Sequence, residues 1–432
     1  MEENINLYES REFKRSRTAY KLECAFEYFA SLMVADSLLA KLLTSIGFSD
    51  AETGILSSFI TLAFLFQIIS IFVIRKITNT KRFAVLFHSL GQMVCVVIFL
   101  VPFMPFTRAF GKAFTIVCVL IAYFGNYMVS TLIYRWGNSF VEPTKRGRFN
   151  SGKEMLSLLT GVVVSITVGI AVDKFDKSGN TKGSFLFIAI AVLIFFAFDL
   201  AMLLLMKNEI RDKQEKKDTV PMRVILKNTL GNKSFRNVII LAILWNCARF
   251  ITVGFLGTYK TEDLAYTMTV IQIINISACL ARALISKPFG KYSDKRSFAK
   301  GIELGLVIAA AAFLSGIFAT PSTRFFIIVH TVLFHVCMAG VEGNFVNVTY
   351  SYVDSRYFAE ASAIKNCISG VFGFGASLVG GRILALVQAN NNTVLGYTVY
   401  GQQILFAISF VLILCAIIFA HFVVGKQKVM IQ

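Results

Sequence analysis

Long apolar segments and short polar ones alternate along most of the chain. Apolar stretches of about 20 residues, the length at which a helix crosses a bilayer, recur about twelve times. In the first half they lie near 22–45, 53–75, 83–105, 113–139, 153–173 and 184–206. In the second half they lie near 237–258, 265–286, 301–319, 325–350, 362–387 and 399–424. Because lipid offers the backbone no hydrogen-bond partner, each stretch is predicted to be an α-helix. The pattern predicts an all-α polytopic membrane protein.

One long polar segment separates the two sets of six spans. We therefore predict an N-terminal six-helix half over 1–206, a linker over 207–236 and a C-terminal six-helix half over 237–432. Lys and Arg gather in this linker and in alternate short loops, whereas most of the intervening loops hold few of them; the loop near 174–182 is the exception. Since cytoplasmic loops carry an excess of Lys and Arg, we expect the linker and both termini in the cytoplasm.

Composition supports the membrane interpretation. Apolar residues make up 56% of the chain, Phe occurs 42 times, and the mean hydropathy is +0.67, which exceeds what a soluble globular protein carries. The net charge of +18 would suggest a nucleic-acid partner if it formed a patch on a polar domain, but the charges are spread over short segments between spans. We therefore expect no nucleic-acid binding. The eight Cys residues lie in apolar stretches without a Cys-x-x-Cys pair, so neither a metal site nor a cofactor is predicted.

Part of the first half recurs in the second. Residues 141–173 align without gaps with residues 353–385, at a shift of 212 positions (365 − 153) that matches Lys153 with Lys365. Small residues recur in the same register, namely Ser157, Gly161, Ser165 and Gly169 in the first copy and Ser369, Gly373, Ser377 and Gly381 in the second. A spacing of four puts them on one helix face, and such faces let helices approach closely in lipid. We expect these faces to form contacts between the two halves.

The segment between the eighth and ninth spans holds Gly290, then Asp294 four residues on, then Lys295 and Arg296. With two six-span halves and a basic central linker, this motif resembles the major facilitator superfamily. The resemblance implies two six-helix bundles related as repeats, around a central cavity lined mainly by spans one, four, seven and ten. It also implies that these four residues take part in gating. The corresponding first-half loop, 74–82, keeps its basic residues but lacks the Gly and the Asp.

The resemblance further implies that Asp294 meets the start of the fifth span when the cytoplasmic side closes. Here that helix is expected to begin near Asn150, where Ser151 and Glu154 have the spacing of a capping box. Free backbone N–H groups and Lys153 would attract a carboxylate there. We therefore assign gating roles to Lys153 and to its repeat partner Lys365 as well.

The spans expected at the cavity carry polar and aromatic side chains. A mid-depth Arg is costly in lipid, so it should face water or a carboxylate; interfacial Tyr and packed Trp are common alternatives to a binding role. The candidate solute-binding residues are Asp36, Tyr123, Asn126, Tyr127, Trp245, Asn246, Arg249 and Glu342.

Proton coupling is assigned to Glu342, with Asp36 and His335 as further candidates. Glu342 and His335 are seven residues apart and so share a helix face, and a carboxyl group that loses hydration resists ionisation. A static ion pair between Glu342 and Arg249 is the alternative. A lone His on an apolar helix usually packs, which is also the expectation for His88 and His330.

Other charged residues within the spans are interpreted as gate or fold residues. They are Glu23, Glu27, Asp199 and Arg282.

Enzyme signatures are absent from the sequence. It has no His-Glu-x-x-His, no Gly-x-Ser-x-Gly and no Gly-rich loop ending in Gly-Lys-Ser/Thr. We predict a secondary or facilitative transporter, monomeric and in the plasma membrane, that moves a small polar organic solute such as a sugar, with protons as a candidate coupling ion. Efflux of amphipathic compounds, or a transporter-like sensor or scaffold that no longer transports, are the alternatives.

Overall fold

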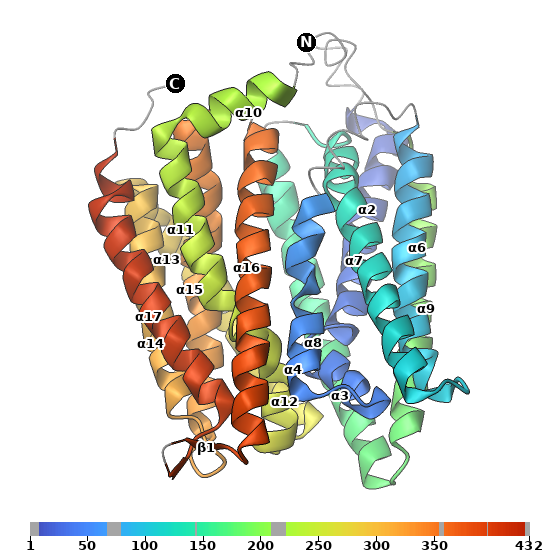
Figure 1. Cartoon of the computed structure of the whole chain (residues 1–432). Coiled ribbons are helices and arrows are strands. Elements are labelled where there is room, and N and C mark those ends of the chain that lie inside the picture. The colour runs from blue at the N-terminus through green and yellow to red at the C-terminus, as the bar shows by residue number, and fades with distance from the viewer. Residues whose placement is uncertain are drawn as a thin grey trace. The chain divides into compact units, whose positions relative to one another are not determined.

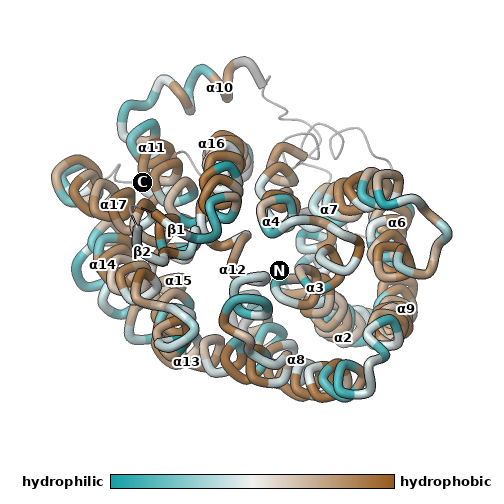
Figure 2. The backbone as a smooth tube through the Cα atoms, turned by 60° about the horizontal axis from the view of Figure 1, so that its bottom comes forward, coloured by the Kyte–Doolittle hydropathy of each residue, from teal (hydrophilic) through white to brown (hydrophobic). Residues whose placement is uncertain are grey.

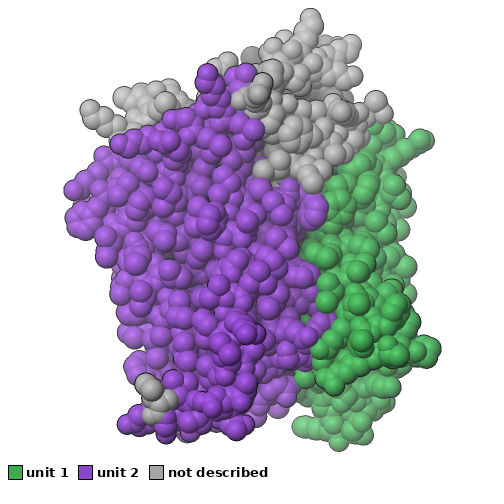
Figure 3. Space-filling view, in the orientation of Figure 1, with its two compact units in different colours: residues 1–47, 69–219 green, residues 48–68, 220–432 purple. Residues whose placement is uncertain are grey.

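A computed structural model describes residues 8–66, 79–142, 145–208, 222–353, 358–394 and 396–427. Nearly all of this part of the chain is helical (Figure 1). Contacts divide the chain into two compact units (Figure 3): one holds residues 1–47 and 69–219, the other 48–68 and 220–432. The segment 48–68 comes from the first half of the sequence, yet it belongs to the unit that contains the second half.

The first unit is a bundle of long helices. They are α2 (Arg11–Met33), α3 (Asp36–Ile46), α6 (Thr80–Leu100), α7 (Arg108–Asn138), α8 (Arg146–Lys177) and α9 (Thr181–Leu205), with a 3₁₀ turn at Val101–Phe103. The helices α2 and α3 meet at an angle of 44°. One buried cluster in this unit includes Phe13, Tyr20 and Leu132 around Trp136. The indole N–H of Trp136 donates to the Lys207 carbonyl (2.7 Å), so this large side chain is buried with its polar atom satisfied.

The second unit is also built from long helices, and it contains several short elements as well. In chain order they are α4 (Asp50–Ser57), α10 (Met222–Gly231), α11 (Lys233–Phe250), a 3₁₀ turn (Val253–Phe255), α12 (Leu256–Thr258), a π-turn (Tyr259–Asp263), α13 (Met268–Lys295), α14 (Phe298–Ile317), α15 (Phe325–Tyr352), α16 (Phe358–Ala389), β1 (Thr393–Val394), β2 (Tyr397–Thr398), α17 (Gly401–Phe422) and a 3₁₀ turn (Val424–Lys426). β1 and β2 pair antiparallel, with Thr393 opposite Thr398. Figure 1 shows α10, within the predicted linker, lying across the ends of α11 and α16.

The apolar character of the helices fits a membrane protein. Within the described residues, ten helices are long and apolar enough to cross a bilayer, or eleven if the bent pair α2 and α3 is one span. The predicted span 53–75 lies partly outside the described residues. Figure 2 shows hydrophobic residues along most of the length of the long helices. Large apolar side chains such as Leu284 (80% exposed) and Val163 (65% exposed) point away from the protein, as lipid-facing side chains do.

Two helix ends differ from the sequence prediction. The helix α13 continues to Lys295, so most of the motif from Gly290 onward forms its last turns instead of a loop. The helix α8 begins at Arg146, so the predicted start near Asn150 with a capping box at Ser151 is wrong. A capping box does form elsewhere: Ser49 and Glu52 cap the start of α4.

The small residues of the repeat lie at close helix contacts, but only in part at the contacts we expected. A Cβ atom added at Gly373 would lie 3.0 Å from Phe250, and one at Gly161 would lie 2.5 Å from Tyr28. These contacts join each repeat to the first helix of its own half, and a contact between the halves stays a prediction for these two glycines. For Gly381 it holds, because a Cβ there would lie 2.7 Å from Ile55 of α4.

Candidate functional site

The centre of the candidate site is an ion pair between α11 and α15. Arg249 Nη1 donates to Glu342 Oε1 at 3.0 Å, and Trp245 Nε1 lies 3.4 Å from the same oxygen. The side chains of Arg249 and Glu342 remain 25% and 41% exposed, so the pair is open to another molecule. Arg249 Nε is buried and has no hydrogen-bond partner in the described structure. This pair is the arrangement that the sequence left as the alternative to proton coupling.

Helical spacing explains why these three groups meet. Trp245 and Arg249 are four residues apart on α11 and therefore share one face. The guanidinium group of Arg249 also lies 4.9 Å from the centre of the Phe250 ring, a distance at which a cation is attracted to an aromatic face. Trp245 itself is 2% exposed and stacks on Phe334 at 6.1 Å. Its ring is therefore a packing element, and its N–H is the part that reaches the ion pair.

Two further predicted residues lie nearby, one on the neighbouring helix α16 and one on α11 itself. Lys365 of α16 is buried, its ammonium group lies 5.2 Å from the centre of the Phe345 ring, and the charge of Glu342 acts on it. Asn246 of α11 lies against Gly373 of α16. The second unit thus brings together a carboxylate, a guanidinium group and an ammonium group from three helices.

In the first unit, Lys153 of α8 occupies a similar environment. Its ammonium group donates to the Tyr20 hydroxyl at 3.0 Å and lies 5.5 Å from the centre of the Tyr134 ring. Both repeated lysines therefore contact an aromatic ring within their own unit.

The predicted residues of the fourth span all lie on α7. Tyr123, Asn126 and Tyr127 are each half-buried. Asn126 lies against α6, where a Cβ added at Gly91 would be 2.8 Å from its Oδ1 atom. That oxygen is buried and has no hydrogen-bond partner within the described ranges. A solute-binding role for these three residues stays a prediction.

The remaining candidates for proton coupling lie in different surroundings. Asp36 is exposed and is the first residue of α3, with a φ of +48° where the first span bends. His335 is half-buried on α15, and its Nδ1 atom donates to the Thr331 carbonyl at 2.9 Å. His330 is buried and contacts the Ala312 carbonyl at 2.9 Å, which agrees with the packing role expected for it.

The predicted gating residues of the second half lie at the end of α13. Gly290, Asp294, Lys295 and Arg296 are all exposed, and Arg296 is the C-cap of the helix. Only Arg296 and Ser297 connect α13 to α14. The predicted contact of Asp294 with the start of the fifth span stays a prediction.

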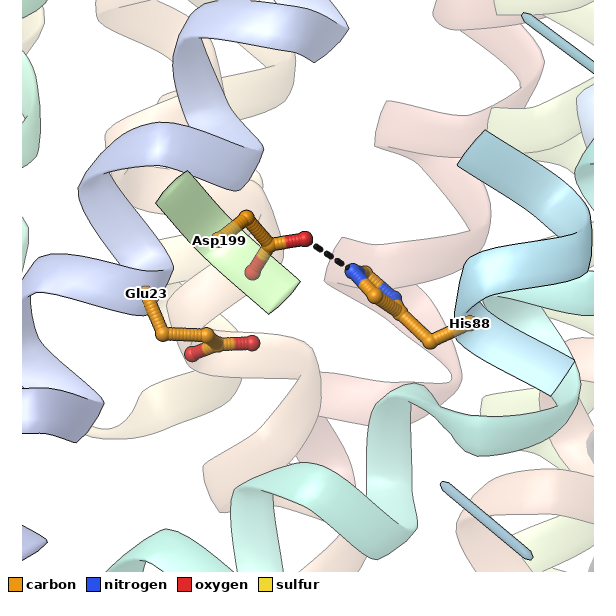
Figure 4. A group of neighbouring side chains, drawn as sticks. All are labelled: Glu23, His88 and Asp199. Carbon is orange, nitrogen blue, oxygen red and sulfur yellow. Dashed lines mark hydrogen bonds and ion pairs between the residues drawn. The ribbon is translucent and has the colours of Figure 1, made fainter. Parts of the chain in front are cut away.

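The structure reveals a second polar cluster, in the first unit, that sequence reasoning did not assemble. Glu23 of α2, His88 of α6 and Asp199 of α9 are each 0–1% exposed. His88 Nε2 contacts Asp199 Oδ2 at 2.5 Å, and one ligand atom from each residue lies within 4.8 Å of the others. Figure 4 shows the three side chains converging from three helices.

Comparisons with known proteins agree with the helical architecture. The sequence profile of the Major Facilitator Superfamily matches residues 24–380. No curated protein sequence gives a significant match.

Several solved structures are similar over nearly the whole chain. A mutant of the nucleoside transporter NupG is 12% identical, with a TM-score of 0.74, and 95% of this chain and 100% of that chain are covered. A bacterial homologue of the human lysosomal transporter Spinster is 14% identical, with a TM-score of 0.69 and coverages of 96% and 98%. A POT family transporter in complex with 5-aminolevulinic acid is 14% identical, with a TM-score of 0.64 and coverages of 95% and 96%. At these identities the likeness concerns the fold alone.

Proposed function

Since the chain belongs to the major facilitator superfamily, we propose that it moves a small polar organic solute, such as a sugar, by exposing one binding site alternately to each side of the membrane. The chain is a multi-pass integral membrane protein, and the structures similar to it include a nucleoside transporter and a transporter in complex with 5-aminolevulinic acid, two chemically different solutes. The fold therefore does not select the solute, and the proposal rests on the chemistry of the site.

The observation that carries the proposal is the partly exposed pair of Arg249 and Glu342. An ion pair inside a membrane protein is expensive and commonly marks a solute or ion pathway. Here it offers a partly exposed guanidinium group that donates beside a carboxylate that accepts. A hydroxyl-rich solute needs both kinds of partner, because each hydroxyl group donates one hydrogen bond and accepts others.

The remaining parts of the proposal concern coupling and orientation. A proton is proposed to replace Arg249 as the partner of Glu342 during the transport cycle, which would couple the solute to a proton gradient. The excess of Lys and Arg in alternate loops supports cytoplasmic termini. A plasma-membrane location and a monomeric state complete the proposal.

Ligand-induced stabilisation of the purified protein tests the site. Sugars, nucleosides, amino acids and amphipathic drugs are added in turn, and the unfolding temperature is measured. A solute that binds only the native state raises this temperature. We expect at least one small polar solute to do so, and we expect Arg249→Gln to lose the response.

The matched control is Arg236→Gln, because Arg236 is exposed in the first turn of the same helix α11. It should respond to the solute as the wild type does. If only amphipathic drugs stabilise the protein, efflux replaces the proposal. If Arg249→Gln keeps the full response, the ion pair is not part of the binding site.

A further inference from the structure

We propose that Glu23, His88 and Asp199 form a binding site for one divalent transition cation inside the first unit. This site is separate from the residues proposed to bind the organic solute, and it does not depend on that proposal. Its three side chains come from three different helices, α2, α6 and α9, so that a bound cation would join them.

Two buried carboxylate oxygens in this cluster lack a partner. Glu23 Oε1 and Asp199 Oδ1 are buried without any hydrogen bond to the described residues. The other oxygen of Glu23 accepts from the Cys24 thiol at 3.1 Å. An unpaired carboxylate oxygen removed from water costs considerable free energy. Figure 4 shows the Glu23 and Asp199 carboxylates and the His88 imidazole turned toward one common space, where a cation would contact all three.

The spacing fits a metal ion better than a hydrogen-bonded acid pair. The ligand atoms lie within 4.8 Å of one another, yet the structure has no hydrogen bond between the carboxyl groups of Glu23 and Asp199. Metal–ligand bonds of about 2.0–2.2 Å place neighbouring ligand atoms roughly 3–4 Å apart. Small side-chain movements would therefore form the site, including a separation of His88 from Asp199.

The charge of the cluster suits a divalent ion once its ligands are deprotonated, as metal ligands must be. The carboxylates of Glu23 and Asp199 with a neutral His88 imidazole carry two negative charges, which one divalent cation would balance. Without an ion, the contact of His88 with Asp199 keeps that imidazole paired.

The donor set narrows the class of cation. One imidazole nitrogen with two carboxylate oxygens suits Zn²⁺, Fe²⁺ or Mn²⁺, whereas Mg²⁺ and Ca²⁺ prefer oxygen ligands alone and Cu⁺ prefers sulfur. The described chain has another His–carboxylate pair, in which His421 Nδ1 lies 2.9 Å from Glu303 Oε1. Its His side chain is 45% exposed, so it serves as a comparison for a surface pair.

Titration of the metal-stripped, full-length protein in detergent with Mn²⁺ tests the proposal, with the free ion measured by electron paramagnetic resonance. We expect one tightly bound Mn²⁺ per chain, which Zn²⁺ displaces. Loss of an outer-shell partner of a metal site typically lowers the affinity for the metal roughly 10–100-fold. We expect at least this loss of Mn²⁺ affinity from each ligand substitution, namely Glu23→Gln, His88→Gln and Asp199→Asn. His421→Gln should bind as the wild type does.

Three results would overturn the proposal. The first is a wild type that binds no equivalent of Mn²⁺ or Zn²⁺, a test that stands even if the variants fail to fold. The second is tight binding that survives all three substitutions or is lost in His421→Gln. The third combines two measurements: neither Mn²⁺ nor Zn²⁺ changes the unfolding temperature of the wild type, and the pH dependence of that temperature disappears in Glu23→Gln. That result would make the cluster a proton-binding group.

Discussion

Glu342 receives hydrogen bonds from two donors at one oxygen, Arg249 Nη1 and Trp245 Nε1. Glu342→Gln keeps an acceptor for both donors but removes the charge and the titration. Because Gln still accepts hydrogen bonds from both donors and its position is partly exposed, the variant should fold. We expect it to lose solute accumulation driven by a pH gradient in proteoliposomes, so that the ratio of inside to outside solute falls to about one, while exchange continues.

The control for this substitution is Asp36→Asn, which removes the other carboxyl group assigned to coupling. Asp36 is exposed at the bend of the first span, and loss of accumulation in its variant but not in Glu342→Gln would assign the coupling role to Asp36 instead. Accumulation by Glu342→Gln at the wild-type level would show that Glu342 is not the coupling residue.

At this scale, sequence reasoning found the ion pair but missed the buried cluster. The depth of Arg249 in its span required a polar partner, and Glu342 was one of few carboxyl groups available. The contact between His88 and Asp199 joins residues 111 positions apart, and helical periodicity says nothing about which spans pack together. An available signal was that three different spans of one half each carry an ionisable residue, which in lipid seldom stands alone.

At the scale of helices, α16 packs against its neighbours through some of its glycines. A Gly→Ala substitution should therefore change the stability of the protein differently at different positions of this helix. A Cβ added at Gly380 would lie 2.6 Å from the Ile251 carbonyl oxygen, whereas one added at Gly375 would meet nothing within 4 Å. Backbone cannot move aside as a flexible side chain can. Gly380→Ala should therefore destabilise the protein by about 1–3 kcal/mol, measured as a lower unfolding temperature in detergent.

Gly375→Ala lies on the same helix and serves as the matched control. An Ala in a helix interior is favoured over Gly by roughly 0.5–1 kcal/mol, so this variant should be as stable as the wild type or slightly more stable. Equal unfolding temperatures for the two variants would contradict the close approach of α16 to residue 251.

Sequence periodicity predicted most helices within a few residues but not how they end. The helix α13 runs past its apolar stretch because the polar residues from Gly290 to Lys295 can stay helical when they are exposed. Similarly, α8 begins at Arg146, four residues before the predicted start. The length of an apolar stretch predicts the part of a helix that lies in lipid. Polar turns that continue the helix beyond the lipid are not marked by hydrophobicity.

Across the whole molecule, the sequence repeat is also a repeat of packing. Lys153 and Lys365 each contact an aromatic ring of the preceding long helix, and Gly161 and Gly373 each contact the first helix of their own half. The repeat did not indicate that residues 48–68 pack with the second unit, because matching residues reveal equivalent positions and not their neighbours.

Exchange of labelled solute across proteoliposomes tests the central claim, that this chain transports a small polar organic solute. Vesicles loaded with the solute that stabilises the purified protein are diluted into its labelled form, and uptake is followed over time. We predict uptake by the wild type and by Arg236→Gln, with uptake reduced to the level of empty vesicles in Arg249→Gln. Binding without any exchange by the wild type would contradict the claim and identify the protein as a non-transporting sensor.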